Sequence, residues 1–142
     1  MAARSRFVFD TNAVVSAALL KRSVSRHAFD KAVAEGKLLV SVETIDELNR
    51  VLSRADLARY LTEDERLEFL AVLLREAELV EITQHVGECR DPQDNKILEL
   101  AVSGKASCII SGDQDLLVLH PFREIPIVTP RDFLDEVWQP QD

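Results

Sequence analysis

The chain has 142 residues, of which 46% are hydrophobic and 30% are charged, and its formal net charge is −8. This length and composition are typical of one globular domain with a buried core, and they exclude disordered and fibrous proteins, so we treat residues 1–142 as a single domain. Non-specific affinity for nucleic acid comes mainly from Lys and Arg that neutralise phosphates. The acidic balance therefore argues against a passive DNA-binding protein, and it is compatible with a site for divalent cations.

The sequence offers no targeting or membrane segment. No stretch reaches the roughly 20 apolar residues that a membrane-spanning helix requires. The first residues, MAARSRFVFD, are basic but lack the long apolar segment of a signal peptide. Cys89 and Cys108 are isolated, without a CxxC pair or zinc-ligand spacing, which indicates reduced and buried thiols. We expect a cytoplasmic protein.

Short apolar runs alternate along the chain with longer segments of helical periodicity. The expected elements, in chain order, are a strand over RFVFD (6–10), a helix over 13–20, a helix from Ser23 or Ser25 to Gly36, a strand over 38–41, helices over 42–54 and 62–77, a strand over 79–82, a helix over 91–104, strands over 108–111 and 125–128, and a last helix around 131–137. Strands that are apolar throughout and alternate with helices predict a parallel sheet covered on both faces. The fold class is therefore α/β, a three-layer α/β/α arrangement around a mainly parallel sheet of about five strands.

Acidic residues follow two of these strands. In a parallel α/β sheet, ligands bind beyond the carboxyl ends of the strands. Asp10 directly follows the first strand, and Gly112 turns the chain after the fourth strand, with Asp113 and Asp115 in the turn. We therefore expect carboxylates from two strand ends at one rim of the sheet. Asp115 also fits a second interpretation, as the cap of a short helix through LLVL.

The helix expected over 91–104 contributes a third acid. Asp94 lies at the centre of its apolar face, whereas Asp91, just before Pro92, is interpreted as the N-cap. The positive end of the helix dipole accounts for an acid at Asp94, but it does not account for the inward direction of that acid. Asp94 is therefore a candidate both for a site and for a helix-start role.

The helix expected over 42–54 contributes a fourth acid. Glu47 lies on the shoulder of its buried face. A capping box between Thr44 and Glu47 is one interpretation. A helix start at Ser41 or Val42 is favoured, however, because Ser41 directly follows the second strand, and Glu47 would then lie beyond the first turn.

Four carboxylates that converge on one rim repel one another unless a cation lies between them. Mg²⁺ and Mn²⁺ prefer oxygen ligands, and a metal-activated water, or a metal pair roughly 3.5–4 Å apart, is suited to attack on a phosphodiester. The pattern therefore predicts a Mg²⁺ or Mn²⁺ site. Its candidate ligands and catalytic residues are Asp10, Glu47, Asp94 and Asp113, with Asp115 as a further candidate ligand.

Two polar residues beside these acids have supporting roles in this hypothesis. Asn12 and Ser111 are candidates for orienting a ligand or a water. Each is equally compatible with a turn former after a strand.

With these motifs the sequence resembles the PIN-domain family of metal-dependent ribonucleases, which includes toxins of bacterial toxin–antitoxin pairs. The four matching segments, in family order, are FVFDTN (7–12), SVETIDELNRVL (41–52), RDPQDNKILELA (90–101) and IISGDQDLL (109–117). The resemblance implies Asp10, Glu47, Asp94 and Asp113 as metal ligands and leaves Asp113 and Asp115 as alternatives in the last motif. Ser111 stands where Thr is commoner and retains the hydroxyl.

The resemblance also implies a substrate and partners. It implies hydrolysis of RNA, a homodimer or higher homo-oligomer and, for the toxins, an antitoxin protein that blocks the site. The hypothesis for this chain is attack by a metal-activated water that leaves 5′-phosphate and 3′-hydroxyl ends. A solvated helix surface is the favoured interpretation of the basic residues near these motifs, and the candidates for holding the RNA phosphates are Lys21, Arg22, Arg26 and Lys96.

Two alternative functions stay open. Haloacid-dehalogenase phosphatases also follow a strand with Asp, but they use Asp-x-Asp, whereas the second position here is Asn12 and Glu47 would have no role. The other alternative is a non-catalytic PIN fold that binds RNA or a protein, against which the presence of all four acids argues. The histidines, His27, His85 and His120, show neither metal spacing nor a nucleophile partner.

Overall fold

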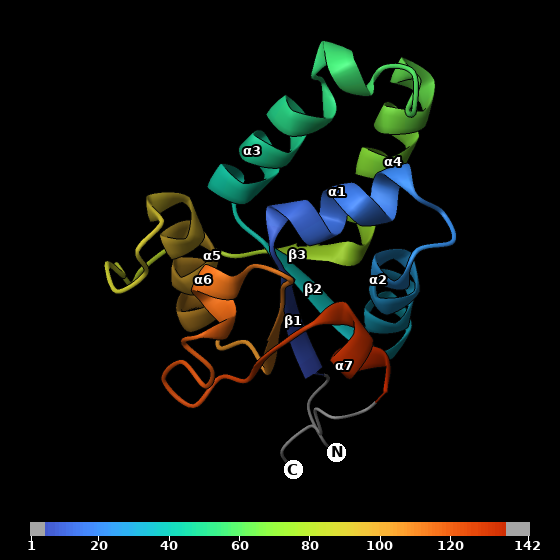
Figure 1. Ribbon diagram of the computed structural model, residues 1–142. Coiled ribbons are helices and arrows are strands. Elements are labelled where there is room, and N and C mark those ends of the chain that lie inside the picture. Colours follow the sequence, from blue (N-terminus) through green and yellow to red (C-terminus); the bar gives the residue numbers. More distant parts are fainter. Residues whose placement is uncertain (1–4, 136–142) are drawn as a thin grey trace.

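A five-stranded sheet runs through the centre of the computed structural model, which describes residues 5–135 (Figure 1). Its strand order is β3-β2-β1-β4-β5, and every neighbouring pair is parallel. The strands are β1 (Ser5–Phe9), β2 (Gly36–Val40), β3 (Ala77–Leu79), β4 (Cys108–Ile110) and β5 (Ile127–Val128). The predicted α/β class with a parallel sheet of about five strands is confirmed.

Helices cover both faces of this sheet. They are α1 (Thr11–Leu19), α2 (Val24–Glu35), α3 (Val42–Leu52), α4 (Glu63–Glu76), α5 (Pro92–Ser103), α6 (Gln114–Leu117) and α7 (Pro130–Leu134), with a 3₁₀ turn over Ala55–Leu57. Side chains of a strand alternate between its faces. Phe7 and Phe9 therefore enter the core beneath α1, α2 and α7, whereas Val8 enters the core beneath α5 and α6. Burial of such side chains contributes roughly 1.5–3 kcal/mol each.

The third strand differs from the prediction. We expected it over 79–82, but it is Ala77–Leu79, because α4 ends at Glu76 and the chain enters the strand at once. It is an edge strand, and its Glu78 carboxylate accepts two hydrogen bonds from the Arg6 guanidinium at 2.9 and 2.7 Å. The expectation that every strand is apolar throughout is therefore wrong for β3, because an edge strand does not need two buried faces.

Smaller differences occur near the C-terminal side of the sheet. Of the strand expected over 125–128, Ile127–Val128 forms β5. The short helix after the fourth strand is α6, and its N-cap is Asp113 rather than Asp115. The last helix is Pro130–Leu134, and residues 136–137 of the expected helix lie outside the described residues. Among the described helices, none has the length and apolar character needed to cross a membrane.

The order of the strands determines where a ligand can bind. From β1 the chain builds β2 and β3 on one side, and it later returns to place β4 and β5 on the other side (Figure 1). The connections after β1 and β4 therefore diverge at the carboxyl ends of these two strands. Such a switch point is where open α/β sheets bind ligands.

Candidate active site

Asp10 lies at this switch point, buried and held on both carboxylate oxygens. It is only 4% exposed, and its Oδ1 accepts a hydrogen bond from the Ala13 N–H at 2.8 Å as the N-cap of α1. Its Oδ2 accepts a short hydrogen bond from the Ser111 hydroxyl. Burial raises the pKa of Asp10, and the charge of Asp113 acts in the same direction, while the bonds from Ser111 and Ala13 partly offset both. The site thus begins with a buried carboxylate whose two oxygens both accept hydrogen bonds.

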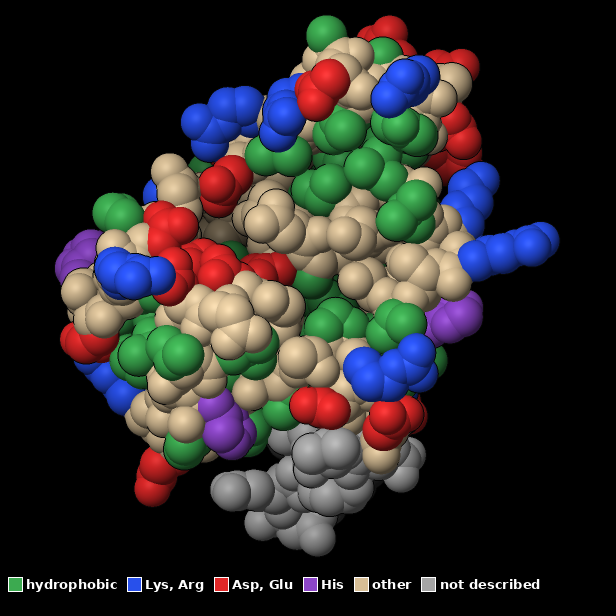
Figure 2. All heavy atoms as spheres, in the orientation of Figure 1, with side chains coloured by type: hydrophobic (Ala, Val, Ile, Leu, Met, Phe, Trp, Pro, Cys, Tyr) green, Lys and Arg blue, Asp and Glu red, His purple; other side chains and the backbone are tan. Residues whose placement is uncertain are grey.

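Three more carboxylates gather at the starts of α5 and α6. Within residues 5–135, one oxygen from each of Asp91, Asp94 and Asp113 lies within 4.8 Å of the others, and we call these residues the acidic cluster. On the face seen in Figure 2, Asp and Glu side chains form a patch over the α5 and α6 side of the molecule. Burial raises the pKa of Asp94 to about 7, reinforced by a hydrogen bond with the Asp113 carboxyl and by the charges of Asp113, Asp91 and Asp10. These acids therefore oppose one another's ionisation.

Ser111 connects the buried Asp10 to the acidic cluster. The side chain is fully buried; its hydroxyl donates to Asp10 and accepts from the Asp113 N–H at 2.9 Å. Asp10 and Asp113 also line one hollow, with a water-accessible volume of about 340 Å³, together with the exposed Asn12. The Ser111 side chain thus joins the ends of β1 and β4.

Glu47 approaches from α3. The helix begins after Ser41, whose side chain forms a capping box with Thr44, so Glu47 lies beyond the first turn as expected and does not cap the helix. Its Oε2 accepts a hydrogen bond from the Thr11 hydroxyl at 3.3 Å. Because Thr11 directly follows Asp10, this bond brings Glu47 to the start of α1, beside the strand end.

Asp115 is arranged differently from Asp113. Its Oδ1 lies 2.6 Å from the Arg90 guanidinium, and its backbone N–H donates to Asp113 Oδ1 at 2.9 Å. Asp115 therefore has a cationic partner, whereas Asp113 belongs to the acidic cluster. The two acids that the motif left as alternatives therefore have different surroundings.

The sequence analysis did not predict that Asp91 would join the acidic cluster or that Arg90 would pair with Asp115. Asp91 is the N-cap of α5, as predicted, with its Oδ1 accepting from the Gln93 N–H at 3.0 Å. The capping role explains an acid at this position by itself, but a carboxylate can cap a helix and still lie close to neighbouring acids. The sequence feature that could have indicated both residues is the run Arg-Asp-Pro at 90–92, where α5 begins.

The residues predicted to bind phosphates line hollows or surfaces other than the hollow of Asp10 and Asp113. Lys21 and Arg26 line a second hollow between α2 and α4, where Arg26 pairs with Asp30 at 3.3 Å and donates to the Ala17 carbonyl. Arg22 is exposed at the turn between α1 and α2. Lys96 lines another hollow, between α3 and α5.

The two cysteines are free and buried, as predicted, but their surroundings differ. Cys108 lies in the sheet core, and burial raises its pKa to about 12. The Cys89 thiol lies 3.8 Å from Asp94 Oδ2 and 3.6 Å from the Asp115 carbonyl oxygen, and burial raises its pKa as well. Cys89 thus packs against the acidic cluster as a neutral thiol.

Comparison with known proteins establishes the family. The profile of the PIN domain matches residues 6–115, so the chain belongs to the PIN domain family, and the resemblance read from its motifs is confirmed. Uncharacterized protein MJ1680 of Methanocaldococcus jannaschii is 26% identical over 142 residues, an alignment that covers 92% of this chain and 90% of the relative.

Solved structures share the fold. VapBC2 from Rickettsia felis, bound to a DNA fragment from its own promoter, matches with a TM-score of 0.58 at 15% identity, over 87% of this chain and 96% of that chain. DNA-bound VapBC from Salmonella typhimurium matches with a TM-score of 0.55 at 17% identity, over 89% of this chain and 98% of that chain. PAE2754 from Pyrobaculum aerophilum matches with a TM-score of 0.56 at 16% identity, over 95% of this chain and 91% of that chain. At these identities the likeness establishes the architecture of the sheet and its helices.

Proposed function

We propose that this protein is a Mg²⁺- or Mn²⁺-dependent endoribonuclease that hydrolyses RNA phosphodiester bonds. The observation that carries the proposal is the acidic cluster: Asp91, Asp94 and Asp113 within 4.8 Å of one another, joined to the buried Asp10 through Ser111. Membership of the PIN domain family, whose profile spans residues 6–115, supports the nuclease activity.

The donor set fits a hard divalent cation. All its donors are carboxylate oxygens, which Mg²⁺ and Mn²⁺ prefer, and a cation among them would offset the burial and the repulsion that together raise the pKa of Asp94. Asp10, Asp94 and Asp113 would hold the ion, with Asp91 and Glu47 as additional or water-mediated ligands. When bound, the ion supplies an activated water and stabilises negative charge on the phosphate.

The chain's own residues prepare this site before substrate arrives. Ser111 and the Ala13 N–H fix the two oxygens of Asp10, and the Thr11 hydroxyl orients Glu47. A fixed first carboxylate reduces the reorganisation needed to bind the ion. Asp115 is assigned as the partner of Arg90 rather than as a ligand, because its Oδ1 is already paired at 2.6 Å.

Cleavage of an RNA oligonucleotide tests the proposal. Wild-type protein should cleave with Mn²⁺ and stop with EDTA, and Asp10→Asn should lose activity by at least about 100-fold, in line with loss of a metal ligand. Asp46→Asn is the matched control, because Asp46 is an exposed acid one residue before Glu47, and it should keep wild-type activity.

The products distinguish the proposed chemistry from its alternatives. They should carry 5′-phosphate and 3′-hydroxyl ends; 2′,3′-cyclic phosphate ends would exclude this chemistry. Release of phosphate from small esters without RNA cleavage would favour the phosphatase alternative, in spite of Asn12. RNA binding without cleavage would favour a non-catalytic module.

We also propose that the protein is the toxin of a toxin–antitoxin pair and forms a homodimer or higher homo-oligomer. The support is the shared fold with two VapBC assemblies solved on DNA. A short gene that overlaps the start of this one should encode the antitoxin, and its product should co-purify with this chain and inhibit cleavage. Light scattering of the isolated chain measures the oligomeric state.

A further inference from the structure

An acidic active site needs a nearby cation to hold a polyanionic substrate. The chain has 25 Asp and Glu against 17 Lys and Arg, and the acidic cluster adds a local excess of negative charge. Arg90 is tied to this cluster by two contacts in series: its guanidinium binds Asp115, and the Asp115 N–H binds Asp113. None of the basic residues expected from the sequence has this connection among the contacts described for residues 5–135.

The Arg90 side chain remains accessible although it is paired. It is 86% exposed, and one guanidinium nitrogen meets Asp115 Oδ1 at 2.6 Å. A guanidinium has five N–H donors in a planar fork that suits the two oxygens of a phosphate. The remaining donors of Arg90 therefore face solvent beside the acidic cluster.

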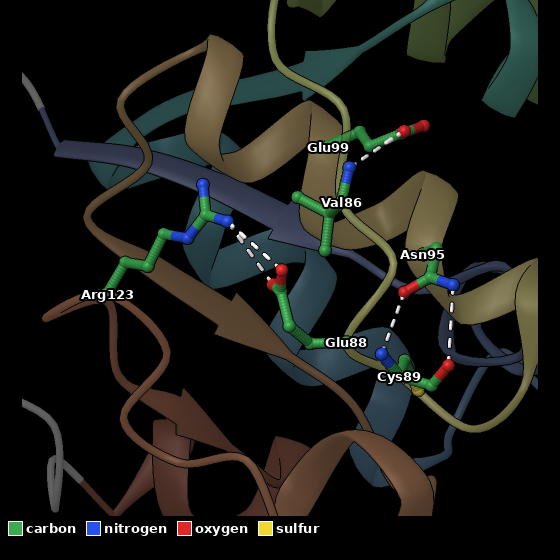
Figure 3. A network of polar contacts seen from close by, with 6 residues as sticks. All are labelled: Val86, Glu88, Cys89, Asn95, Glu99 and Arg123. Carbon is green, nitrogen blue, oxygen red and sulfur yellow. Dashed lines mark hydrogen bonds and ion pairs between the residues drawn. The ribbon is translucent and has the colours of Figure 1, made fainter.

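The loop that leads into α5 is tied to α5 and to a second loop through Val86, Glu88 and Cys89 (Figure 3), and Arg90 directly follows Cys89 in this loop. The Asn95 amide brackets Cys89, accepting from its N–H at 2.9 Å and donating to its carbonyl at 3.4 Å. The Val86 N–H donates to Glu99 at 3.1 Å, and Arg123 pairs with Glu88 at 3.3 Å. On the other side of Arg90, Asp91 caps α5. The backbone on both sides of Arg90 is thus held by hydrogen bonds, which reduces the entropy that the loop loses when Arg90 binds a ligand.

Stability of the fold is a weak explanation for the Arg90–Asp115 pair. Exposed ion pairs contribute little to stability. Arg6 provides the contrast: its side chain is 31% exposed, it binds both oxygens of Glu78, and it donates to the Gly104 carbonyl, which uses the fork within the protein. Among residues 5–135, the described contact of the Arg90 guanidinium is the one with Asp115, which uses only one of its nitrogens.

We infer that Arg90 is a substrate-binding residue that contacts a phosphate of single-stranded RNA next to the bond that is cleaved, and that Asp115 holds it in position. The inference rests on the proposed ribonuclease function and names a residue of that same site. The Asp115 carboxylate orients one edge of the guanidinium, and the other edge binds the phosphodiester. The substrate phosphate then stays beside the acidic cluster without direct contact with its acids.

The test measures KM, kcat and salt dependence for cleavage of a fluorescent single-stranded RNA with Mn²⁺. Arg90→Ala should raise KM about tenfold, as loss of a charge-assisted hydrogen bond predicts, and leave kcat within about twofold. It should also reduce the slope of log(kcat/KM) against log(salt) by about 0.7, the value for one phosphate contact on a single strand. Arg90→Lys should recover part of the KM. Arg54→Ala removes an arginine from another exposed pair, with Asp56 at 2.9 Å, and should leave KM unchanged.

The double variant Arg90→Ala/Asp115→Asn separates substrate binding from neutralisation of Asp115. If Arg90 only neutralises Asp115, removing both charges restores the wild-type KM, and the inference is overturned. If Arg90 binds phosphate, the double variant is as impaired as Arg90→Ala. A wild-type KM and salt slope in Arg90→Ala would also overturn the inference while the ribonuclease function stands. Wild-type protein that cleaves no RNA would overturn both. The rise in Tm with Mn²⁺ should persist in Arg90→Ala, because Arg90 holds substrate and not the ion.

Discussion

Replacing Asp94 with Asn removes a negative charge that, in the absence of metal, destabilises the folded state. Asp94 is 8% exposed at the start of α5, among Asp91, Asp113 and Asp10. Burial and these neighbours raise its pKa from the ordinary value of 3.8 to about 7. Asn has nearly the same shape and no charge. In EDTA, Asp94→Asn should therefore be at least as stable as wild-type protein at neutral pH.

The pH dependence has a definite sign. Between pH 3.8 and about 7 the folded state keeps a proton on Asp94 that the unfolded state has released, so stability falls as pH rises through this window and is level above it. One pKa unit corresponds to about 1.4 kcal/mol, so the free energy of unfolding falls by at most about 2 kcal/mol between roughly pH 5.5 and roughly pH 8.5. Solvent screening and sharing of the charge within the cluster reduce this to about 1–2 kcal/mol.

Chemical denaturation in EDTA at the two pH values measures this effect. The stability of Asp94→Asn relative to wild type should rise by about 1–2 kcal/mol from the lower to the higher pH, which is roughly 2–8 °C in Tm. Asp64→Asn is the matched control, because Asp64 lies in the first turn of α4 and is exposed. It should lose about 0.3–1 kcal/mol of helix-dipole stabilisation at both pH values.

Metal should reverse this difference in stability, so that wild-type protein becomes more stable than Asp94→Asn. Saturating Mn²⁺ should stabilise wild-type protein, by about 2.7 kcal/mol at a concentration 100 times its Kd, and should have little effect on Asp94→Asn. A metal-free Asp94→Asn protein that is clearly less stable than wild type at the higher pH would refute this reasoning. Asp94 would then act as a helix-start residue that stabilises α5.

Four further substitutions, the last of them a control, test other parts of the structure. Ser111→Ala leaves Asp10 Oδ2 and the Asp113 N–H without their shared partner, so denaturation should show a loss of about 1–3 kcal/mol, and Mn²⁺ titration should show weaker binding. Glu47→Gln should lower RNA cleavage by about 10- to 100-fold with Tm unchanged in EDTA, and an unchanged cleavage rate would remove Glu47 from the site. Gly36→Ala would place a Cβ 2.3 Å from the Ser5 carbonyl oxygen and should cost about 1–3 kcal/mol, whereas Gly87→Ala meets nothing within 4 Å and should be neutral or slightly stabilising.

Local patterns were sufficient to predict the elements that carry most of the candidate site. Asp10 was placed by the end of an apolar strand, and Asp94 by the phase of the apolar residues in α5, which it shares with Ile97, Leu98 and Ala101. The start of α3 at Ser41 placed Glu47 beyond the capping turn, as expected. These predictions held because they depend on backbone periodicity and on caps, which involve residues within a few positions of one another.

Contacts between distant residues decided what the sequence left open or missed. The position of β3 depended on its place at the edge of the sheet and on the pairing of Glu78 with Arg6, 72 residues away. The separation of Asp113 from Asp115 depended on Arg90, 25 residues earlier in the chain. The approach of Asp91 to Asp113 depended on how α5 and α6 lie at the switch point. The sequence determined which segments become strands and helices and which acids they carry, because those properties are local; the tertiary structure decided which charges meet, because Coulomb energy depends on separation in space and not along the chain.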